Sequence, residues 1–123
     1  MKLSQINYQV ETPAKIEIKD PETGLSFDKP AFIHIYSLDS AIGRNASLNI
    51  YRAMLEAKEK EVEFDKKTTL EIMATLIHSF EGIEDEKGKE IKCTDETKIE
   101  LLKNDIIYKL VDRESGKLAN FKA

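Results

Sequence analysis

Two short segments of alternating apolar and polar residues, joined by a turn sequence, constrain the fold of this chain most strongly. The segments are "AKIEIK", residues 14–19, and "AFIHIY", residues 31–36, and both have the two-residue period of a half-buried β-strand. Between them, "DPETG" combines residues that favour reversal of the chain. The sequence therefore predicts a hairpin with Ala31, Ile33 and Ile35 on one face. An isolated hairpin is only marginally stable, so one of its faces must pack on other elements.

The segment after the hairpin has the spacing of a long amphipathic helix. We expect this helix over about residues 39–60, begun by N-capping side chains among Ser37, Asp39 and Ser40. Apolar residues at intervals of three and four predict the stripe that packs on the hairpin. These residues are Leu48, Tyr51 and Leu55, widened by Ile50, Met54 and Ala57.

Three further helices complete the expected fold. One runs from residue 67 or 68 to Phe80, with His78 near its terminal carbonyls. Two shorter helices follow, over residues 95–103 and from about residue 105 to Gly116, where a left-handed cap is expected. The predicted fold class is α+β, with an N-terminal β-hairpin packed on a bundle of about four helices.

Length and composition indicate one domain that folds without metal or disulfides. The 123 residues match the size of a single domain, 1–123, in which residues 1–13 could form a flexible N-terminal arm. Cys93 is the single cysteine, and with two histidines it leaves no set of soft ligands for zinc. We expect no cofactor and no metal site.

The charge pattern argues against nucleic acid and membranes as partners. The chain has 23 acids and 19 Lys and Arg residues, and the bases alternate with acids, as in "EAKEKEVEFDKK". No apolar run is long enough to cross a bilayer, and the N-terminal residues lack the apolar stretch of a signal peptide. Together with the lone thiol, these features favour the cytoplasm.

The acidic stretch "FEGIEDEKGKEIKCTDE", residues 80–96, resembles a calcium loop only superficially. A calcium loop needs acids at positions one, three and five, glycine at six and glutamate at twelve. With Gly88 at position six, these positions include Ile83, Lys87 and Thr94. The stretch instead predicts a tight turn over residues 85–88, flanked by Ile83 and Ile91 in short extended pieces.

No catalytic motif is visible in the sequence. The chain has no nucleophile elbow and no glycine-rich phosphate loop, and its isolated glycines are explained as turn residues. Its acids lie in no context that would raise a pKa. We therefore expect a protein that is not an enzyme.

The order of several motifs resembles the tail assembly chaperones of long-tailed bacteriophages and their prophages. The resemblance covers about residues 16–121 and includes the turn after the first strand, an Asp-Ser pair before the long helix, an aromatic residue and glycine before the acidic turn, and a closing Asn-Phe. The matching residues are Asp20, Pro21, Thr23, Gly24, Asp39, Ser40, Phe80, Gly82, Gly88, Leu101, Leu102, Asn120 and Phe121.

The resemblance implies a chaperone in the cytoplasm of the bacterial host. Such a protein keeps the long, apolar tape measure protein soluble until the tail tube protein polymerises around it, and it self-associates into a homo-oligomer. This function requires apolar surface for a helix and charged surface for solubility. The candidate protein-binding residues are Ile106, Ile107, Tyr108 and Phe121, for which core packing is the alternative.

Two other functions are compatible with the sequence. A structural tail or head completion protein would share the size and fold class but would remain in the virion. A small regulatory module could bind a host protein through its acidic surface.

Overall fold

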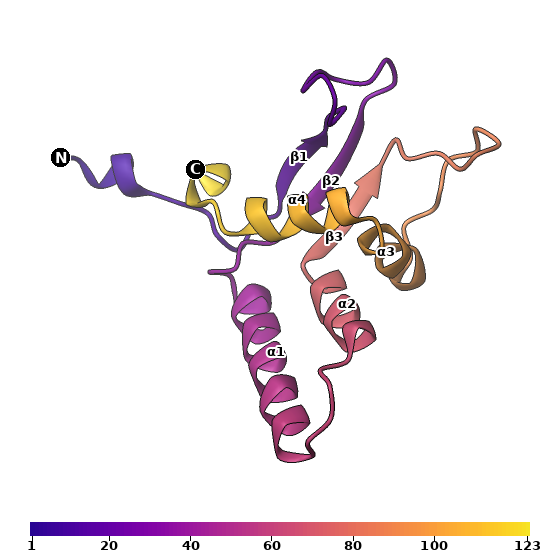
Figure 1. Cartoon of the computed structure of the whole chain (residues 1–123). Coiled ribbons are helices and arrows are strands. Elements are labelled where there is room, and N and C mark those ends of the chain that lie inside the picture. Colours follow the sequence, from indigo (N-terminus) through magenta and orange to yellow (C-terminus); the bar gives the residue numbers. More distant parts are fainter.

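A computed structural model describes residues 1–123 and confirms the expected α+β fold, with one additional strand. The antiparallel sheet has the strand order β1-β2-β3. Its strands are β1 (Ala14–Ile18), β2 (Ala31–Ile35) and β3 (Ile77–Glu81). The helices are α1 (Ala41–Glu59), α2 (Lys66–Ala74), α3 (Asp95–Leu102) and α4 (Asp105–Ser115), and they pack in the order of the chain (Figure 1).

The predicted hairpin and its turn are confirmed, and Ala31, Ile33 and Ile35 are all buried on one face. Ile16 of β1 lies opposite Ile33 of β2 in the antiparallel ladder. At the turn, the amide of Gly24 donates to the carbonyl of Asp20 at 2.8 Å, and Gly24 has a φ of 71°. This left-handed conformation is accessible to glycine at little cost, which explains the residue at the end of "DPETG".

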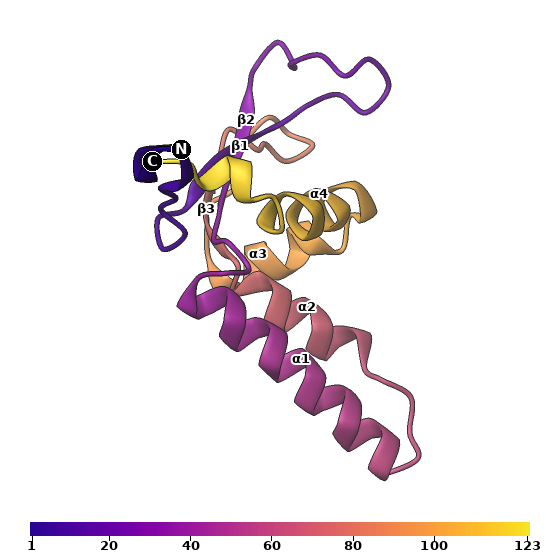
Figure 2. The same cartoon turned by 90° about the vertical axis from the view of Figure 1, so that its left-hand side faces the viewer.

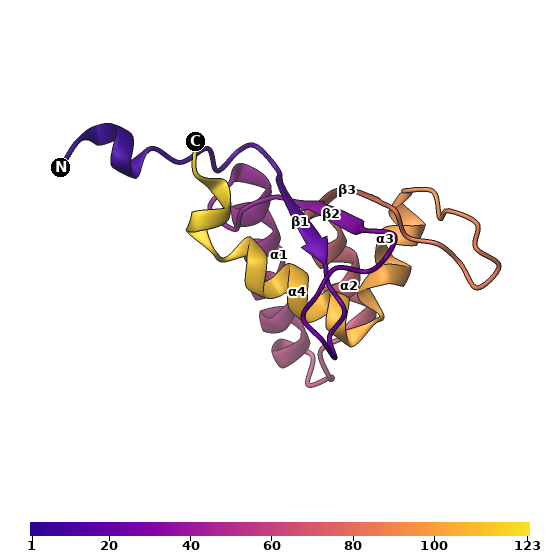
Figure 3. The same ribbon diagram turned by 90° about the horizontal axis from the view of Figure 1, so that it is seen from above.

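One face of the sheet forms the core and the other is polar. Ile33 and Ile35 of the central strand are completely buried, and Phe80 of β3 lies opposite Ile33. Leu102 and Val111, from the last two helices, belong to the same core cluster. The opposite face includes Lys15, whose Nζ lies 4.2 Å from the centre of the Phe32 ring. The helices therefore cover only one face, as Figure 3 shows from above.

The second predicted helix is wrong beyond Ala74, where α2 ends. The following residues instead form β3, which pairs with the free edge of β2, and the amide of Tyr36 donates to the carbonyl of Leu76 at 2.8 Å. Leu76, Ile77 and Phe80 are buried, as expected, but Leu76 lies in the turn before β3, and Ile77 and Phe80 lie in the strand itself. Short apolar runs of this kind fit helix and strand patterns equally well, and pairing with β2 decides between them.

His78 accordingly does not lie at a helix end, and that prediction is also wrong. It lies within β3 with an exposed side chain, and its Nδ1 is 3.0 Å from the Oγ of Ser79. Its ring also contacts the ring of Tyr36 edge to face, with centroids 5.8 Å apart.

The acidic stretch forms the predicted tight turn. The amide of Gly88 donates to the carbonyl of Asp85 at 3.0 Å, and the amide of Ile91 donates to the carbonyl of Ile83 at 2.8 Å. The Asp85 carboxylate accepts hydrogen bonds from the amides of Lys87 and Lys89, both at 2.9 Å. Asp85 thus stabilises the turn itself.

The last two helices begin at the predicted caps. The hydroxyl of Thr94 accepts from the amide of Thr97 at 3.1 Å, and the Asn104 side chain accepts from the amides of Ile106 and Ile107. Gly116 ends α4 with a φ of −88°, so the expected left-handed cap is wrong. Backbone hydrogen bonds to Arg113 and Glu114 close this end in a right-handed conformation.

The two ends of the chain pair with each other beside the sheet. Residues 1–7 are exposed and include a 3-10 helix, Leu3–Ile6, that extends from the body (Figure 1). The amide of Gln9 donates to the carbonyl of Phe121 at 2.6 Å, and Tyr8 bridges to Lys122. The flexibility of the arm over residues 1–13 stays a prediction. No helix combines the length and apolar character needed to span a membrane.

We expect Gly43→Ala to destabilise the fold, although alanine normally favours a helix by about 1 kcal/mol. A Cβ at Gly43 would lie 2.1 Å from the carbonyl oxygen of Ser37 and 2.5 Å from the Cα of Leu38. Relieving this overlap should cost more than about 2 kcal/mol of unfolding free energy in urea denaturation. Ser47→Ala, an exposed site on the same helix, is the control and should have little effect. A stabilised Gly43→Ala variant would contradict this packing.

Glu114 links α4 to the C-terminal 3-10 helix, Leu118–Phe121. Its side chain accepts from Asn120 Nδ2 at 2.8 Å and lies 3.2 Å from Lys117 Nζ and 3.3 Å from Arg113 Nε. Burial alone would raise the pKa of Glu114, but the hydrogen bonds from Asn120, Lys117 and Arg113 hold it below its ordinary value of 4.5.

Because the folded pKa of Glu114 is lowered, its contribution to stability is present above pH 4.5 and lost as the pH falls through the lowered value. We expect the unfolding free energy of Glu114→Gln to fall less steeply than that of the wild type below pH 4.5. Urea denaturation across this range measures the difference. Glu86→Gln, at an exposed residue of the acidic turn, should keep the wild-type slope. Parallel slopes for Glu114→Gln and the wild type would show that the contact adds nothing.

Candidate functional site

The helix α1 has two apolar faces, and only one of them packs inside the domain. The inner face consists of small or medium side chains at intervals of three and four residues: Gly43, Ala46, Ile50, Ala53 and Ala57. Ala46 is 3% exposed, and Ile50 packs against the core cluster. Small side chains allow the backbone of α1 to approach α2 and the Ser37–Leu38 segment closely. The inner face therefore anchors the helix.

The outer face of α1 carries larger apolar side chains that remain in solvent. Leu48, Tyr51 and Leu55 are 43%, 59% and 43% exposed, and together we call them the outer stripe. Met54, which is 53% exposed, lies between the two faces. Leu48, Tyr51 and Leu55 lie about 150° around the helix from the inner face. The prediction that these residues pack on the hairpin is wrong, whereas Ile50 and Ala57 are partly buried as expected.

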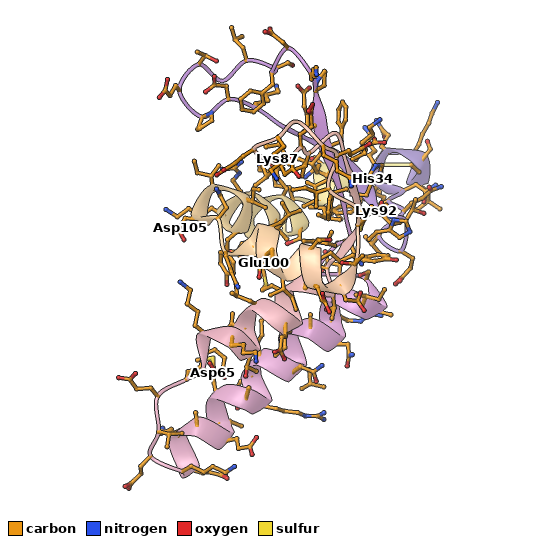
Figure 4. All side chains as sticks on the ribbon, turned by 90° about the vertical axis from the view of Figure 1, so that its right-hand side faces the viewer. His34, Asp65, Lys87, Lys92, Glu100 and Asp105 are labelled. Carbon is orange, nitrogen blue, oxygen red and sulfur yellow. The ribbon has the colours of Figure 1, made fainter.

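The position of α1 explains why its outer face stays uncovered. The helix packs mainly against α2, and the two helices project together from the sheet (Figure 2). Asp65, the N-cap of α2, lies in this projection, distant from His34 in the sheet (Figure 4). No other element reaches the solvent side of α1 in these views. The outer stripe is therefore available to a partner.

Basic side chains flank the outer stripe. Arg44, Arg52 and Lys58 lie on or beside this face by helical geometry, and Glu59 is the nearest acid. One guanidinium nitrogen of Arg44 donates to the carbonyl of Asp39 at 2.8 Å, whereas Arg52 and Lys58 form no ion pair. An apolar stripe bordered by free cations suits a partner helix with an apolar face and acidic borders.

The four residues predicted to bind protein are distributed between surface and core. Ile106 is half exposed, whereas Phe121 is 3% exposed and belongs to the core cluster. Ile107 and Tyr108 are partly buried against that cluster. Burial, together with the charge of Asp112, raises the pKa of Tyr108. In this conformation Ile106 is the one of the four that presents a large apolar surface to solvent.

Several titratable groups form ion pairs, among them Glu81 on the polar face of the sheet. Glu81 lies 3.3 Å from Lys15 Nζ and 3.4 Å from His34 Nε2 on the polar face of the sheet. A hydrogen bond from Lys15, followed by one from His34, lowers the pKa of Glu81. The contacts of Glu81 with Lys15 and His34 therefore connect β1 and β3 across β2.

Cys93 is exposed, and no group of three or more His, Cys, Asp or Glu side chains is placed to hold a metal ion.

Comparison of the chain with protein-family models, with curated proteins and with solved structures finds no match. The assignment of a site therefore depends on the geometry of the chain itself. The largest apolar side chains exposed on one regular element are those of the outer stripe. Sequence periodicity detected this stripe but could not show that it faces solvent. The small residues of the inner face were the available signal, because they mark the side on which α1 can pack closely.

We expect the double substitution Leu48→Gln and Leu55→Gln to leave the fold intact. Both side chains are 43% exposed, so the change in unfolding free energy should remain within about 1 kcal/mol. Ala46→Gln, on the inner face of the same helix, should cost several times as much because its site is buried. Thermal and urea denaturation of the three proteins compare the two faces. A large loss from the outer substitutions would show that this face packs within the domain.

Proposed function

We propose that this chain is a tail assembly chaperone of a long-tailed bacteriophage or prophage. It binds the tape measure protein in the cytoplasm of the bacterial host and keeps it soluble while the tail tube protein polymerises around it. The chain acts by covering apolar surface and makes or breaks no covalent bonds. The observation that carries this proposal is the outer stripe of α1, and the motif order of the sequence supports it.

The outer stripe supports this role because it fits an amphipathic helix. Leu48, Tyr51 and Leu55 follow each other at intervals of three and four residues, which matches the apolar face of a second helix. Covering one such side chain completely contributes about 1.5–3 kcal/mol, before the cost of immobilising the partner is subtracted. One stripe alone would therefore bind a helix only moderately tightly.

Moderate affinity favours several copies of the chaperone on one partner. The 19 residues of α1 span about 28 Å, which is short beside a long helical protein. Copies that bind along such a helix, and contact each other, would strengthen the complex through effective concentration. We therefore propose that the chain functions as a homo-oligomer on the tape measure protein. Its 42 charged side chains, 23 acidic and 19 basic, would keep the assembly in solution.

Co-expression with the tape measure protein tests the proposed function. The wild type should increase the soluble fraction of the tape measure protein, whereas the double variant Tyr51→Glu and Leu55→Glu should lose most of this effect. Its matched control is Leu25→Glu with Phe27→Glu, which places two acids on exposed apolar residues outside the stripe. Circular dichroism of each purified variant shows whether it is folded.

The proposal fails if the wild type leaves the solubility of the tape measure protein unchanged. It also fails in its choice of surface if both double variants solubilise the partner equally well. If only the Leu25→Glu, Phe27→Glu variant fails to solubilise the tape measure protein, the binding site lies in the loop between β1 and β2 instead.

A further inference from the structure

The outer edge of β1 is an unpaired sheet edge beside an open groove. β1 pairs only with β2, and no backbone hydrogen bond outside that ladder involves residues 14–18. A groove of about 630 Å³ runs along this edge, between β1 and α4. Figure 3 shows α4 alongside β1. The unpaired backbone groups of an edge strand can form hydrogen bonds with a further extended chain.

One side of α4 lines this groove with the apolar side chains of Ile106 and Leu110 and the charged side chain of Arg113. These three residues are separated by four and three positions and therefore follow one line along the helix. Ile16 and Ile18 of β1 line the groove beside them. An extended chain next to β1 would place alternate side chains on this apolar surface.

The groove has the length of a short strand. The amide of Leu38, which follows β2, donates to the carbonyl of Ser115 at 3.0 Å, so the end of α4 lies near the start of β1. The helix thus runs antiparallel to β1. Five residues of strand and eleven residues of helix both extend about 17 Å, so that the two walls match in length.

Two charged groups along this edge, one within β1 and one directly after it, have no partner within the chain. The Oε2 atom of Glu17 is buried without a hydrogen bond, and Lys19 forms neither an ion pair nor a hydrogen bond. Lys15, by contrast, is already paired with Glu81 at 3.3 Å. In an added strand, a basic residue opposite Glu17 and an acidic residue opposite Lys19 would form two pairs of opposite charge. Each such cross-strand pair contributes modestly to the stability of strand pairing.

We propose that the groove between β1 and α4 binds an extended segment of a partner protein as an additional antiparallel strand. The segment carries apolar residues at alternate positions, which contact Ile106 and Leu110. Its intervening residues carry an acid opposite Lys19 and a base opposite Glu17. Antiparallel addition is favoured because this pairing is slightly more stable per residue. The proposal does not depend on the outer stripe, which lies on the projecting α1–α2 pair (Figure 1).

Two synthetic peptides test the charge pattern. The first, acetyl-Glu-Ile-Lys-Ile-Thr-amide, complements the edge in the antiparallel direction, and the second, acetyl-Lys-Ile-Glu-Ile-Thr-amide, exchanges its charges. Titration of the ¹⁵N-labelled full chain, followed by NMR, should show shifts of β1 and α4 amides with the first peptide. We expect the second to bind about fivefold more weakly. The double variant Glu17→Lys and Lys19→Glu should reverse this preference.

The apolar contact is tested separately with Ile106→Glu. This residue is 50% exposed, so the variant should fold, and its affinity for the first peptide should decrease about fivefold or more. Leu25→Glu, at an exposed residue outside the groove, should bind the peptide as the wild type does. A melting curve for each variant separates misfolding from lost binding.

Several results would overturn the proposal. Equal affinity for both peptides would show that the charge pattern does not determine binding. Chemical-shift changes outside β1 and α4 would show that the peptide binds elsewhere. Absence of binding at millimolar peptide would mean that the charges of β1 simply protect the edge from pairing. Amide protection of β1 that rises with protein concentration without peptide would assign the edge to a second copy of this chain.

Discussion

The arrangement of this protein depends on the burial of the central strand β2. Ile33 and Ile35 are completely buried, and neighbouring strands pair with both edges of β2. The core-facing side of this strand must be covered, whereas its other side contributes His34 to a network of charges with Lys15 and Glu81. The helices consequently lie on one face of the sheet, and the outer edges of β1 and β3 remain unpaired by any further strand.

The packing of α1 follows from the sizes of its side chains. Gly43 and Ala46 allow close contact with the Ser37–Leu38 turn and with the core, so the larger residues of the helix point away. Leaving Leu48, Tyr51 and Leu55 in water gives up the free energy that their burial would provide. A partner helix that covers them would recover part of it. The same exposed residues that lower the stability of the free chain thus provide the surface for the proposed binding.

Much of the fold could be predicted from the sequence because local signals agreed with the tertiary structure. The hairpin could be predicted from alternating apolar and polar residues and from a turn that contains glycine. The starts of α3 and α4 could be predicted from the capping side chains of Thr94 and Asn104. The strand β3 was missed because the buried spacing of Leu76, Ile77 and Phe80 suits two kinds of element. Only the need of β2 for a second neighbour distinguishes them, and that need is a property of the whole sheet.

The candidate site was harder to predict than the fold, since periodicity shows that a face exists but not what covers it. The spacing of Leu48, Tyr51 and Leu55 predicts an apolar stripe that packs in the core, but this stripe faces solvent. Among the residues chosen as binding candidates, Phe121 is buried and Ile106 lines the groove beside β1. Edge strands and grooves arise from elements distant in the sequence, so neither the unpaired edge of β1 nor its neighbour α4 could be identified from local pattern.

Covalent footprinting of the chain mixed with its proposed partner, the tape measure protein, tests the central claim most directly. A photoreactive diazirine label, read by mass spectrometry, reports the solvent accessibility of individual side chains in the chain alone and in the mixture. The account requires labelling of Leu48, Tyr51 and Leu55 to fall on binding, while exposed Leu25 and Phe27 remain unchanged. Equal labelling of the outer stripe in the free and bound protein would contradict the account.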